Sequence, residues 1–453
     1  MKSTIHFYGG TGTVTGANFM LDTGQSKILV DCGLIQGGQF AETANATPFA
    51  YDPTTVNTLL VTHAHADHIG RIPKLVREGF AGKIYSTLPT KELAAVMFAD
   101  ALNIMRYEYE RFGRQLIYEE EDIDATLALW QTVGYEEPIN LPDDVMARFT
   151  DAGHILGSGM VSVERGGRKM VFTGDVGNVP QPLLNPPVVP TDYHYLLMES
   201  VYGDRLHEQV VERNELLLSE IKRVQKTGGT LIIPAFSLER TQALLFEINN
   251  FVETGTIKSL PVFLDSPLAI KVTEIYRRHL DYLKDAVQKQ IKAGDDIFAF
   301  PGLAFTQTLK ESNKIEETTG AKIIIAGSGM SHGGRIRRHE QKYLGDSKNT
   351  VLLVGYQTVG SLGRLLQDGA NKVVIDDVPV KVRARIATIA GFSGHADRDQ
   401  LLDLVAQGGG KAERVFVTMG EERASLFLVQ RLRDYLGLNA TAPALGESEE
   451  IDF

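Results

Sequence analysis

The sequence contains a single cysteine, Cys32, among 453 residues. An intramolecular disulfide is therefore impossible, and a reducing compartment such as the cytoplasm is the expected location. The chain also lacks any run of about 18 consecutive apolar residues, so no transmembrane helix is expected. Its first residues, Met1 to His6, lead into an alternating strand pattern without the apolar core of a signal peptide.

Positive charge is in deficit, with 46 Lys and Arg against 57 Asp and Glu and a net charge of −11. This balance argues against a protein that coats nucleic acid nonspecifically. It leaves open a nuclease whose metal ions supply the local positive charge. Two basic clusters could form a local basic wall, or they could be ordinary solvated faces: Arg335, Arg337, Arg338 and Lys342, and Lys381, Arg383 and Arg385. The length favours two domains over one.

The strongest signal is the hexapeptide His63-Ala64-His65-Ala66-Asp67-His68, which follows an apolar run typical of a buried strand. Four metal-capable side chains in six residues cannot all point at one ion. The spacing instead suggests two groups, His63 with His65 and Asp67 with His68. Imidazole and carboxylate ligands in this mixture suit zinc, or manganese and iron where carboxylates dominate.

Other expected strand ends carry the same residue types. His154 and Asp175 each follow a short strand pattern, and His395 follows a later one. Asp31 ends an early strand and is a candidate to accept the second N–H of a ligating imidazole, with a simple turn aspartate as the alternative.

From about residue 200 the pattern becomes strand, short loop and helix in alternation, which predicts a parallel sheet with helices on its faces. Ligands then belong at the carboxyl ends of the strands. The loops 234–237, 327–331 and 355–357 carry small and hydroxylated residues ahead of helix starts, which suits phosphate oxygens as well as tight turns. The candidate phosphate-binding residues are Ser237, Arg240, Ser328, Gly329, Ser331 and Arg364.

Taken in order, these motifs resemble the β-CASP branch of the metallo-β-lactamase superfamily, a group of RNA- and DNA-processing nucleases. More narrowly, the sequence resembles prokaryotic homologues of the endonuclease subunit of the cleavage and polyadenylation specificity factor. Asp31, the hexapeptide, His154 and Asp175 correspond to the first four motifs of the family. Glu199 matches the acidic motif that opens the β-CASP segment, and His395 matches the histidine motif that closes it.

The resemblance implies an α/β fold: a four-layer αβ/βα metallo-β-lactamase core with an inserted parallel-sheet β-CASP domain. The core would comprise residues 1–204 and 381–453, and the insert residues 205–380. The family pattern also implies two Zn²⁺ ions, with Mn²⁺ as the alternative metal. By that pattern the ligands of the first are His63, His65 and His154, those of the second are Asp67, His68 and His395, and Asp175 bridges the two ions.

The activity implied is a zinc-dependent ribonuclease, an endonuclease or a 5′-exonuclease or both, acting in RNA processing or decay. Two metals about 3.5–4 Å apart can hold a hydroxide that attacks a phosphodiester of single-stranded RNA. Asp67, Asp175 and Glu199 are the expected catalytic carboxylates, because carboxylates take up or orient protons. Dimers are common in proteins of this kind, so a homodimer is a further expectation.

One difference from the family pattern concerns the expected rate of RNA cleavage. Family members usually carry another histidine before the closing motif, thought to protonate the leaving oxygen, whereas this sequence has none between His339 and His395. Leu365 stands at the matching position, so Glu199 would lack the partner it has in the family. His332 could replace it, although a loop histidine is the simpler interpretation. An RNA-binding paralogue with weak or no nuclease activity, or a small-ester metallohydrolase, therefore stays open.

Overall fold

The computed structural model describes residues 2–37, 41–207, 210–355, 357–358, 360–408 and 410–453. The chain divides into two compact units. The first unit comprises Met1–Val179, Asn185–Leu206 and His395–Phe453, and the second comprises Pro180–Leu184 and His207–Gly394. The first unit is thus built from both ends of the chain. The chain returns to it at His395 and not at residue 381, because Arg385–Ile389 still pairs within the sheet of the second unit.

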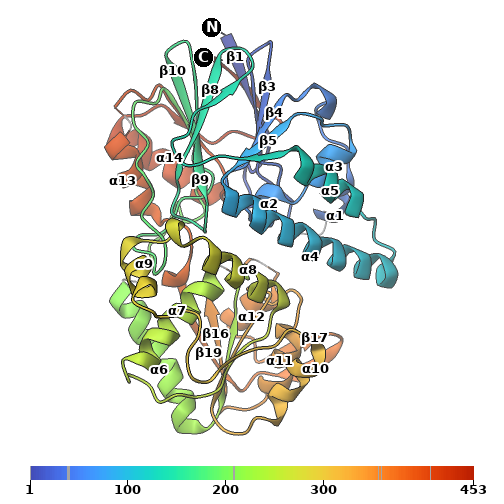
Figure 1. Cartoon of the computed structure of the whole chain (residues 1–453), viewed down its shortest axis with the longest axis vertical. Coiled ribbons are helices and arrows are strands. Elements are labelled where there is room, and N and C mark those ends of the chain that lie inside the picture. Colours follow the sequence, from blue (N-terminus) through green and yellow to red (C-terminus); the bar gives the residue numbers. More distant parts are fainter. Residues whose placement is uncertain (1, 38–40, 208–209, 356, 359, 409) are drawn as a thin grey trace. The chain divides into compact units, whose positions relative to one another are not determined.

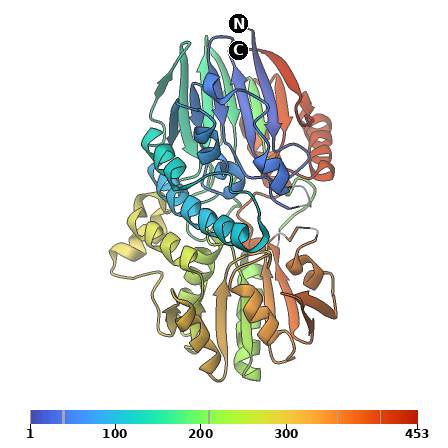
Figure 2. The ribbon, with the colours of Figure 1, turned by 90° about the vertical axis from the view of Figure 1, so that its right-hand side faces the viewer.

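The first unit contains two sheets of seven strands each. One sheet has the order β22 (Ser448–Asp452), β1 (Lys2–Gly9), β2 (Asn18–Asp22), β3 (Lys27–Val30), β4 (Thr58–Leu60), β5 (Lys83–Ser86) and β6 (Trp130–Thr132). The other has the order β21 (Ala440–Thr441), β20 (Arg414–Val417), β11 (Tyr195–Met198), β10 (Arg168–Phe172), β9 (Gly159–Arg165), β8 (Val145–Asp151) and β7 (Ile139–Leu141). The first and last strands pair antiparallel, so the two termini lie side by side (Figure 2).

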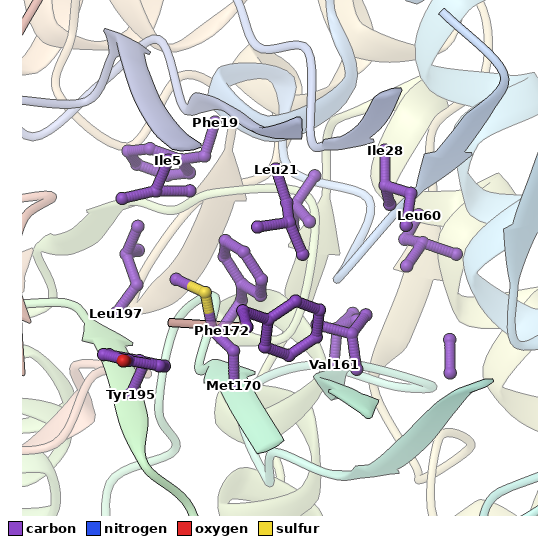
Figure 3. Packing of buried hydrophobic residues seen from close by; sticks show 14 of the residues in the cluster. Ile5, Phe19, Leu21, Ile28, Leu60, Val161, Met170, Phe172, Tyr195 and Leu197 are labelled. Atoms are coloured by element: carbon purple, nitrogen blue, oxygen red, sulfur yellow. The ribbon is translucent and has the colours of Figure 1, made fainter. Parts of the chain in front are cut away.

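The main core of the first unit lies between these two sheets (Figure 3). Side chains alternate along β1, so that Ile5 and Phe7 point inward and are completely buried. Opposite them lie Met170 and Phe172 of β10 and Leu197 of β11. Burial of side chains of this size stabilises the fold by about 1.5–3 kcal/mol each.

Helices cover the outer faces of both sheets. On one side α3 (Ile72–Arg77), α4 (Leu88–Phe112) and α5 (Glu120–Leu129) lie together (Figure 1), and Phe98 of α4 packs on Trp130 of β6. On the other side α13 (Arg398–Gly408) and α14 (Glu422–Leu436) bury a second apolar cluster against β11 and β20. The expected four-layer arrangement of the first unit is therefore confirmed. Two short helices, α1 (Ala41–Ala46) and α2 (Ala66–Ile69), complete this unit.

The second unit is built on a six-stranded sheet in which every pairing is parallel, as expected. Its order is β14 (Leu303–Phe305), β13 (Val262–Leu264), β15 (Lys322–Ala326), β12 (Thr230–Pro234), β16 (Thr350–Val354) and β19 (Arg385–Ile389). The strands β12, β15 and β16 are buried on both faces, as parallel strands between helix layers must be.

Helices of the second unit surround this sheet (Figure 1). They are α6 (Val210–Thr227), α7 (Arg240–Glu253), α8 (Pro267–Arg278), α9 (Asp285–Lys292), α10 (Leu309–Lys314), α11 (Ile336–Tyr343) and α12 (Leu362–Gln367). A hairpin of β17 (Lys372–Ile375) and β18 (Val378–Lys381) follows α12. None of the helices in the described parts of either unit combines the length and the apolar composition that crossing a membrane requires.

Two segments have a structure that their sequence pattern does not indicate. The sequence has helical periodicity over residues 120–133, but α5 ends at Leu129 and Trp130–Thr132 pairs as a strand with β5. The Trp130 ring is 3% exposed and its indole N–H donates to Ser86, so tertiary packing outweighs the helical pattern there. The acidic tail, which gave no clear pattern, contains β22 along the edge of β1.

Candidate metal centre

The metal-capable side chains lie just after strands of both sheets in the first unit. Asp31 directly follows β3, and the loop after β4 carries His63 and His65. His154 lies beyond β8, and Asp175 beyond β10. His395 joins them from far along the chain because its backbone bridges to Gly177 and the next amide, Ala396 N–H, donates to Val176.

Four ligand atoms converge in a first group. The Nε2 atom of His63 lies 3.1 Å from Nδ1 of His65, and Nε2 of His154 lies 3.2 Å from that same Nδ1. Oδ2 of Asp175 lies 3.3 Å from His63 Nε2 and 3.4 Å from His154 Nε2. A tetrahedral ion about 2.0–2.1 Å from each ligand would separate the ligand atoms by about 3.3 Å. The spacing of these four atoms therefore fits a divalent metal ion.

The other carboxylate oxygen of Asp175 faces His68. Oδ1 of Asp175 lies 3.2 Å from Nε2 of His68, and neither buried atom has a hydrogen-bond partner in the described structure. On its far side, Nδ1 of His68 donates to Oδ2 of Asp31 over 2.7 Å. Because Asp31 holds Nδ1, Nε2 is the nitrogen that faces Asp175, and it is available to a metal ion once its own proton is displaced. Buried polar atoms in proteins nearly always have a partner. Nε2 of His68 and Oδ1 of Asp175 therefore fit a metal ligand and a bridging carboxylate, respectively.

Asp31 is held in place by Thr62, a residue that the sequence reading did not single out. The Thr62 amide donates to Oδ1 of Asp31 and its hydroxyl to Oδ2, both over 2.8 Å. The same hydroxyl lies 3.0 Å from Nδ1 of His63. Thr62 therefore links both sides of the cluster, and its place directly before His63 was the available signal.

His395 has a carboxylate partner of its own. Its Nδ1 lies 3.1 and 3.2 Å from the two oxygens of Glu199 and 3.8 Å from Oδ2 of Asp175. Glu199 also accepts from the amide of Val176 over 2.6 Å and from that of Val201 over 3.3 Å. The family histidine expected to contact Glu199 is absent from this sequence, and in the structure the carboxylate contacts His395. Asp175, Glu199 and His395 form the second group of converging ligand atoms among the described residues.

Asp67 belongs to neither of these two groups. Its side chain is partly exposed, whereas the ligands around it are mostly buried. Its main chain has a fixed role, because its carbonyl accepts the amide of Ala17. Gly33 packs against the same carbonyl so closely that a Cβ there would lie 1.5 Å from the oxygen. Position 33, in the loop after β3, therefore requires glycine so that the loop can pack directly against the hexapeptide.

Burial and neighbouring charges set the protonation of the cluster. Burial, together with the adjacent His63 and His154, holds the pKa of His65 well below its ordinary value, so the ring is neutral and free to bind a metal. Burial opposes ionisation of Asp175, but His68, His395 and His63 outweigh it and hold its pKa well below the usual range. Burial likewise opposes the charged form of His68, yet Asp175 and Asp31 raise its pKa. Asp175 is therefore the carboxylate that stays ionised.

The candidate phosphate-binding residues lie in the loops and helix starts that follow β12, β15 and β16, and most of their polar atoms have protein partners. The guanidinium of Arg240 donates to the carbonyls of Phe392 and Val354, and that of Arg364 to Asp368. Ser331 is completely buried and donates to Glu340 over 2.5 Å.

The remaining three phosphate candidates are glycine or serine. Ser328 accepts from the amides of His332 and Gly333. Gly329 packs on Phe236, whose ring a Cβ would meet at 2.4 Å. Ser237 lies 3.4 Å from the hydroxyl of Ser266, a strand-end residue that was not anticipated. Tyr356 of the third candidate loop lies outside the described residues.

The basic clusters are largely ion-paired within the second unit. Acidic partners lie within 2.5–3.2 Å of the following residues: Arg335, Arg337, Arg338, Lys342 and Arg385. The clusters thus behave as ordinary paired faces. Leu365 lies on α12 and is 49% exposed, and the ring of His332 lies 3.4 Å from the Thr358 hydroxyl.

Comparison with protein families accounts for most of the chain. The model of the metallo-beta-lactamase superfamily matches residues 12–202, that of the Beta-Casp domain residues 241–366, and that of the Zn-dependent metallo-hydrolase RNA specificity domain residues 379–443. Ribonuclease TTHA0252 of Thermus thermophilus is 36% identical over 423 residues, which cover 93% of this chain and 94% of that protein. The chain belongs to the metallo-β-lactamase superfamily and its β-CASP branch. It is thereby a metal-dependent hydrolase.

Other members of this family are similar along nearly the whole chain. An RNase J-like protein of Methanocaldococcus jannaschii is 28% identical over 448 residues, covering 98% of both chains. Transcription termination factor FttA of Methanosarcina mazei is 30% identical over 454 residues, covering 96% of this chain and 69% of that protein. A crystal structure of a protein of unknown function from Enterococcus faecalis V583 matches with a TM-score of 0.57, 13% identity and 100% coverage of both chains, which supports the fold alone.

Proposed function

We propose that this β-CASP protein is a zinc-dependent ribonuclease that hydrolyses phosphodiester bonds in single-stranded RNA, as an endonuclease, a 5′-exonuclease or both. The observation that carries the proposal is the position of Asp175 between two sets of imidazoles, with one oxygen toward His63 and His154 and the other toward His68. A carboxylate shared in this way is suited to bridging two ions. The similarity to proteins named ribonuclease and RNase J-like supports RNA as the substrate.

The residues present fit two divalent ions. His63, His65 and His154 would hold one, and His68 and His395 the other, with Asp175 between them. The family pattern adds Asp67 to the second set. Zinc suits this histidine-rich set, and manganese is the alternative because carboxylates contribute too. When bound, such a pair supplies a nucleophile at neutral pH and neutralises charge that develops on the phosphoryl oxygens.

The protein side chains then have separate tasks. Asp31 fixes the ring of His68, and Glu199 fixes the ring of His395, so each imidazole presents one defined nitrogen to the centre. Burial raises the pKa of Asp67. As a partly exposed carboxyl beside the buried ligands, Asp67 can accept a hydrogen bond from the attacking water and orient it.

Cleavage of end-labelled RNA tests the proposal. Purified protein is incubated with 5′-labelled and with 3′-labelled single-stranded RNA, with and without chelator. We expect cleavage that stops on chelation and returns with added zinc or manganese, and that is absent in His65→Ala. Cleavage that survives chelation and His65→Ala would overturn the proposal.

One alternative is supported by a specific observation. Leu365 occupies the position where the family usually has a histidine, so an RNA-binding paralogue with weak or no turnover is the second candidate. The same experiment separates the two, because the paralogue would bind RNA in a gel-shift assay without cutting it.

The homodimer and the cytoplasmic location also stay predictions. Light scattering on the purified protein and fractionation of the source cells would check them.

A further inference from the structure

A hollow on the first unit is lined by residues other than the metal-capable cluster. It is lined by Arg398, Asp399 and Leu402 of α13 and by Arg431 and Tyr435 of α14, and it has a volume of about 200 Å³. All five residues fall within the segment that matches the RNA specificity domain. Pockets for drug-sized ligands occupy about 300–1,000 Å³, so this hollow suits one group of a longer polymer, such as a phosphate or a ring.

Arg431 is the central group of the hollow. Its guanidinium carbon lies 4.9 Å from the ring centroids of both Phe427 and Tyr435, one helical turn away on either side. It donates a hydrogen bond to the Tyr435 hydroxyl. No carboxylate lies within ion-pair distance of Arg431 in the described part of the chain, in contrast to the arginines of the second unit. A guanidinium placed on aromatic rings without an acidic partner is available to a phosphate.

The neighbours of Arg431 add an exposed aromatic ring and a second arginine to the hollow. The Tyr435 side chain is 65% exposed, which leaves ring surface free for a base. The side chain of Arg398 lines the same hollow from α13 and is ion-paired with the adjacent Asp399. Exposed aromatic rings beside arginines are how proteins without sequence preference hold single-stranded nucleic acid, with bases on the rings and phosphates on the guanidinium groups.

The hollow is connected to the metal centre through the backbone. The helix α13 begins at Arg398, three residues after His395. The Arg398 amide donates to the carbonyl of Arg205, in the segment that follows Glu199. Both the metal-binding histidine and the hollow are therefore fixed to one short stretch of the first unit.

We propose that the α13–α14 hollow is a subsite for single-stranded RNA that stacks one base on Tyr435 and holds one phosphate against Arg431 and Arg398. The proposal rests on the proposed ribonuclease function and names where a second part of the same substrate is held. Acidic peptides would also be attracted by the arginines, but they offer no flat base for the exposed tyrosine ring.

Binding measured without cleavage tests the subsite. Fluorescence anisotropy of a labelled 20-nucleotide single-stranded RNA is recorded in chelator for the wild type, Tyr435→Ala, Tyr435→Phe and Arg431→Gln. We expect Tyr435→Ala to bind about 5- to 150-fold more weakly and Tyr435→Phe to bind nearly as well as the wild type, because stacking needs the ring alone. Arg431→Gln should reduce the slope of log affinity against log salt by about 0.7, the value for one phosphate contact.

A matched control comes from the first unit itself. On α4, Arg111 lies over the ring of Tyr107, four residues before it, and donates to its hydroxyl, and Tyr107 is 53% exposed. This pair lies outside the RNA specificity match. Tyr107→Ala should therefore bind RNA like the wild type. In turnover of the same RNA, Tyr435→Ala should raise KM while kcat stays within about twofold, since stacking here is remote from the reacting atoms.

The outcomes separate the two proposals. If the wild type binds and cleaves RNA but Tyr435→Ala matches it, the subsite is refuted and the ribonuclease stands. Equal loss in Tyr107→Ala would also overturn the subsite, because any exposed tyrosine would then behave alike. If the wild type neither binds nor cleaves RNA, the proposed function fails and the subsite falls with it.

Discussion

The contact between Glu199 and His395 makes Glu199→Gln the most informative substitution at the metal centre. The carboxylate accepts from three donors: the amides of Val176 and Val201 and the ring of His395. Glutamine has the same shape but one acceptor oxygen and one NH₂ group. In the variant, at least one of the three donors therefore faces the NH₂ group of glutamine, which is itself a donor. We expect His395 to lose its fixed orientation.

The size of the effect follows from the burial of the site. Glu199 is 1% exposed, so no water can replace the lost acceptor. A buried donor without a partner costs about 1–3 kcal/mol. At 1.36 kcal/mol for each tenfold, this is about 5- to 150-fold. Loss of a carboxylate that orients a metal-binding histidine typically costs 10–100-fold in affinity or activity. We therefore expect metal affinity to fall about 10- to 100-fold.

Competition with a chromophoric zinc chelator measures this affinity directly, and RNA cleavage at saturating zinc measures turnover. Glu247→Gln is the matched control. Glu247 is also buried, at 7% exposure, and its carboxylate accepts from Asn214 in the second unit. It should lower the melting temperature without changing zinc affinity.

A different outcome would refute the role of Glu199 as a positioning residue. If zinc affinity is unchanged while turnover at saturating zinc falls about 10²- to 10⁴-fold, Glu199 acts in proton transfer. That result would restore the catalytic role expected from the sequence and separate it from His395.

Three further outcomes are expected. Leu365→His should raise RNA cleavage at least about tenfold by supplying a general acid; an unchanged rate in a folded variant would mean that the proton comes from elsewhere. Burial raises the pKa of Glu340 to about 8, so this carboxyl is protonated in the fold, and the stability it contributes is complete below about pH 4 and lost as the pH rises through 8. Urea unfolding should show stability falling from pH 5 to 8 and a flatter profile for Glu340→Gln; parallel profiles would contradict this. Gly33→Ala should lower the melting temperature and zinc affinity together, because a Cβ would strike the Asp67 carbonyl; wild-type values for both would refute the close packing.

The sequence was informative wherever chemistry is concentrated in short motifs. Histidines two residues apart after a buried strand already indicated a metal loop, and the structure brings His63 and His65 within 3.1 Å. The alternation of strands and helices after residue 200 predicted the parallel sheet, since buried strands such as β15 read as continuous apolar runs.

Contacts between residues far apart in the sequence could not be predicted from the spacing of motifs. Glu199 and His395 lie 196 positions apart, so their hydrogen bond depends on how β11 and the returning chain fold together. The environment of Ser331 was equally hidden: a hydroxyl in a glycine-rich loop suggested phosphate, yet it is buried against Glu340 on α11. Trp130 shows the same effect on secondary structure, because its burial under α4 outweighs a helical pattern.

The central claim is that the buried cluster around Asp175 holds the catalytic metal ions. Metal analysis of the purified wild type and of Asp175→Ala by mass spectrometry tests it most directly. We expect about two zinc-like ions for each wild-type chain, as a two-metal site requires, and a clear loss in the variant. Less than one ion for each wild-type chain after reloading, or equal metal content in both proteins, would contradict it.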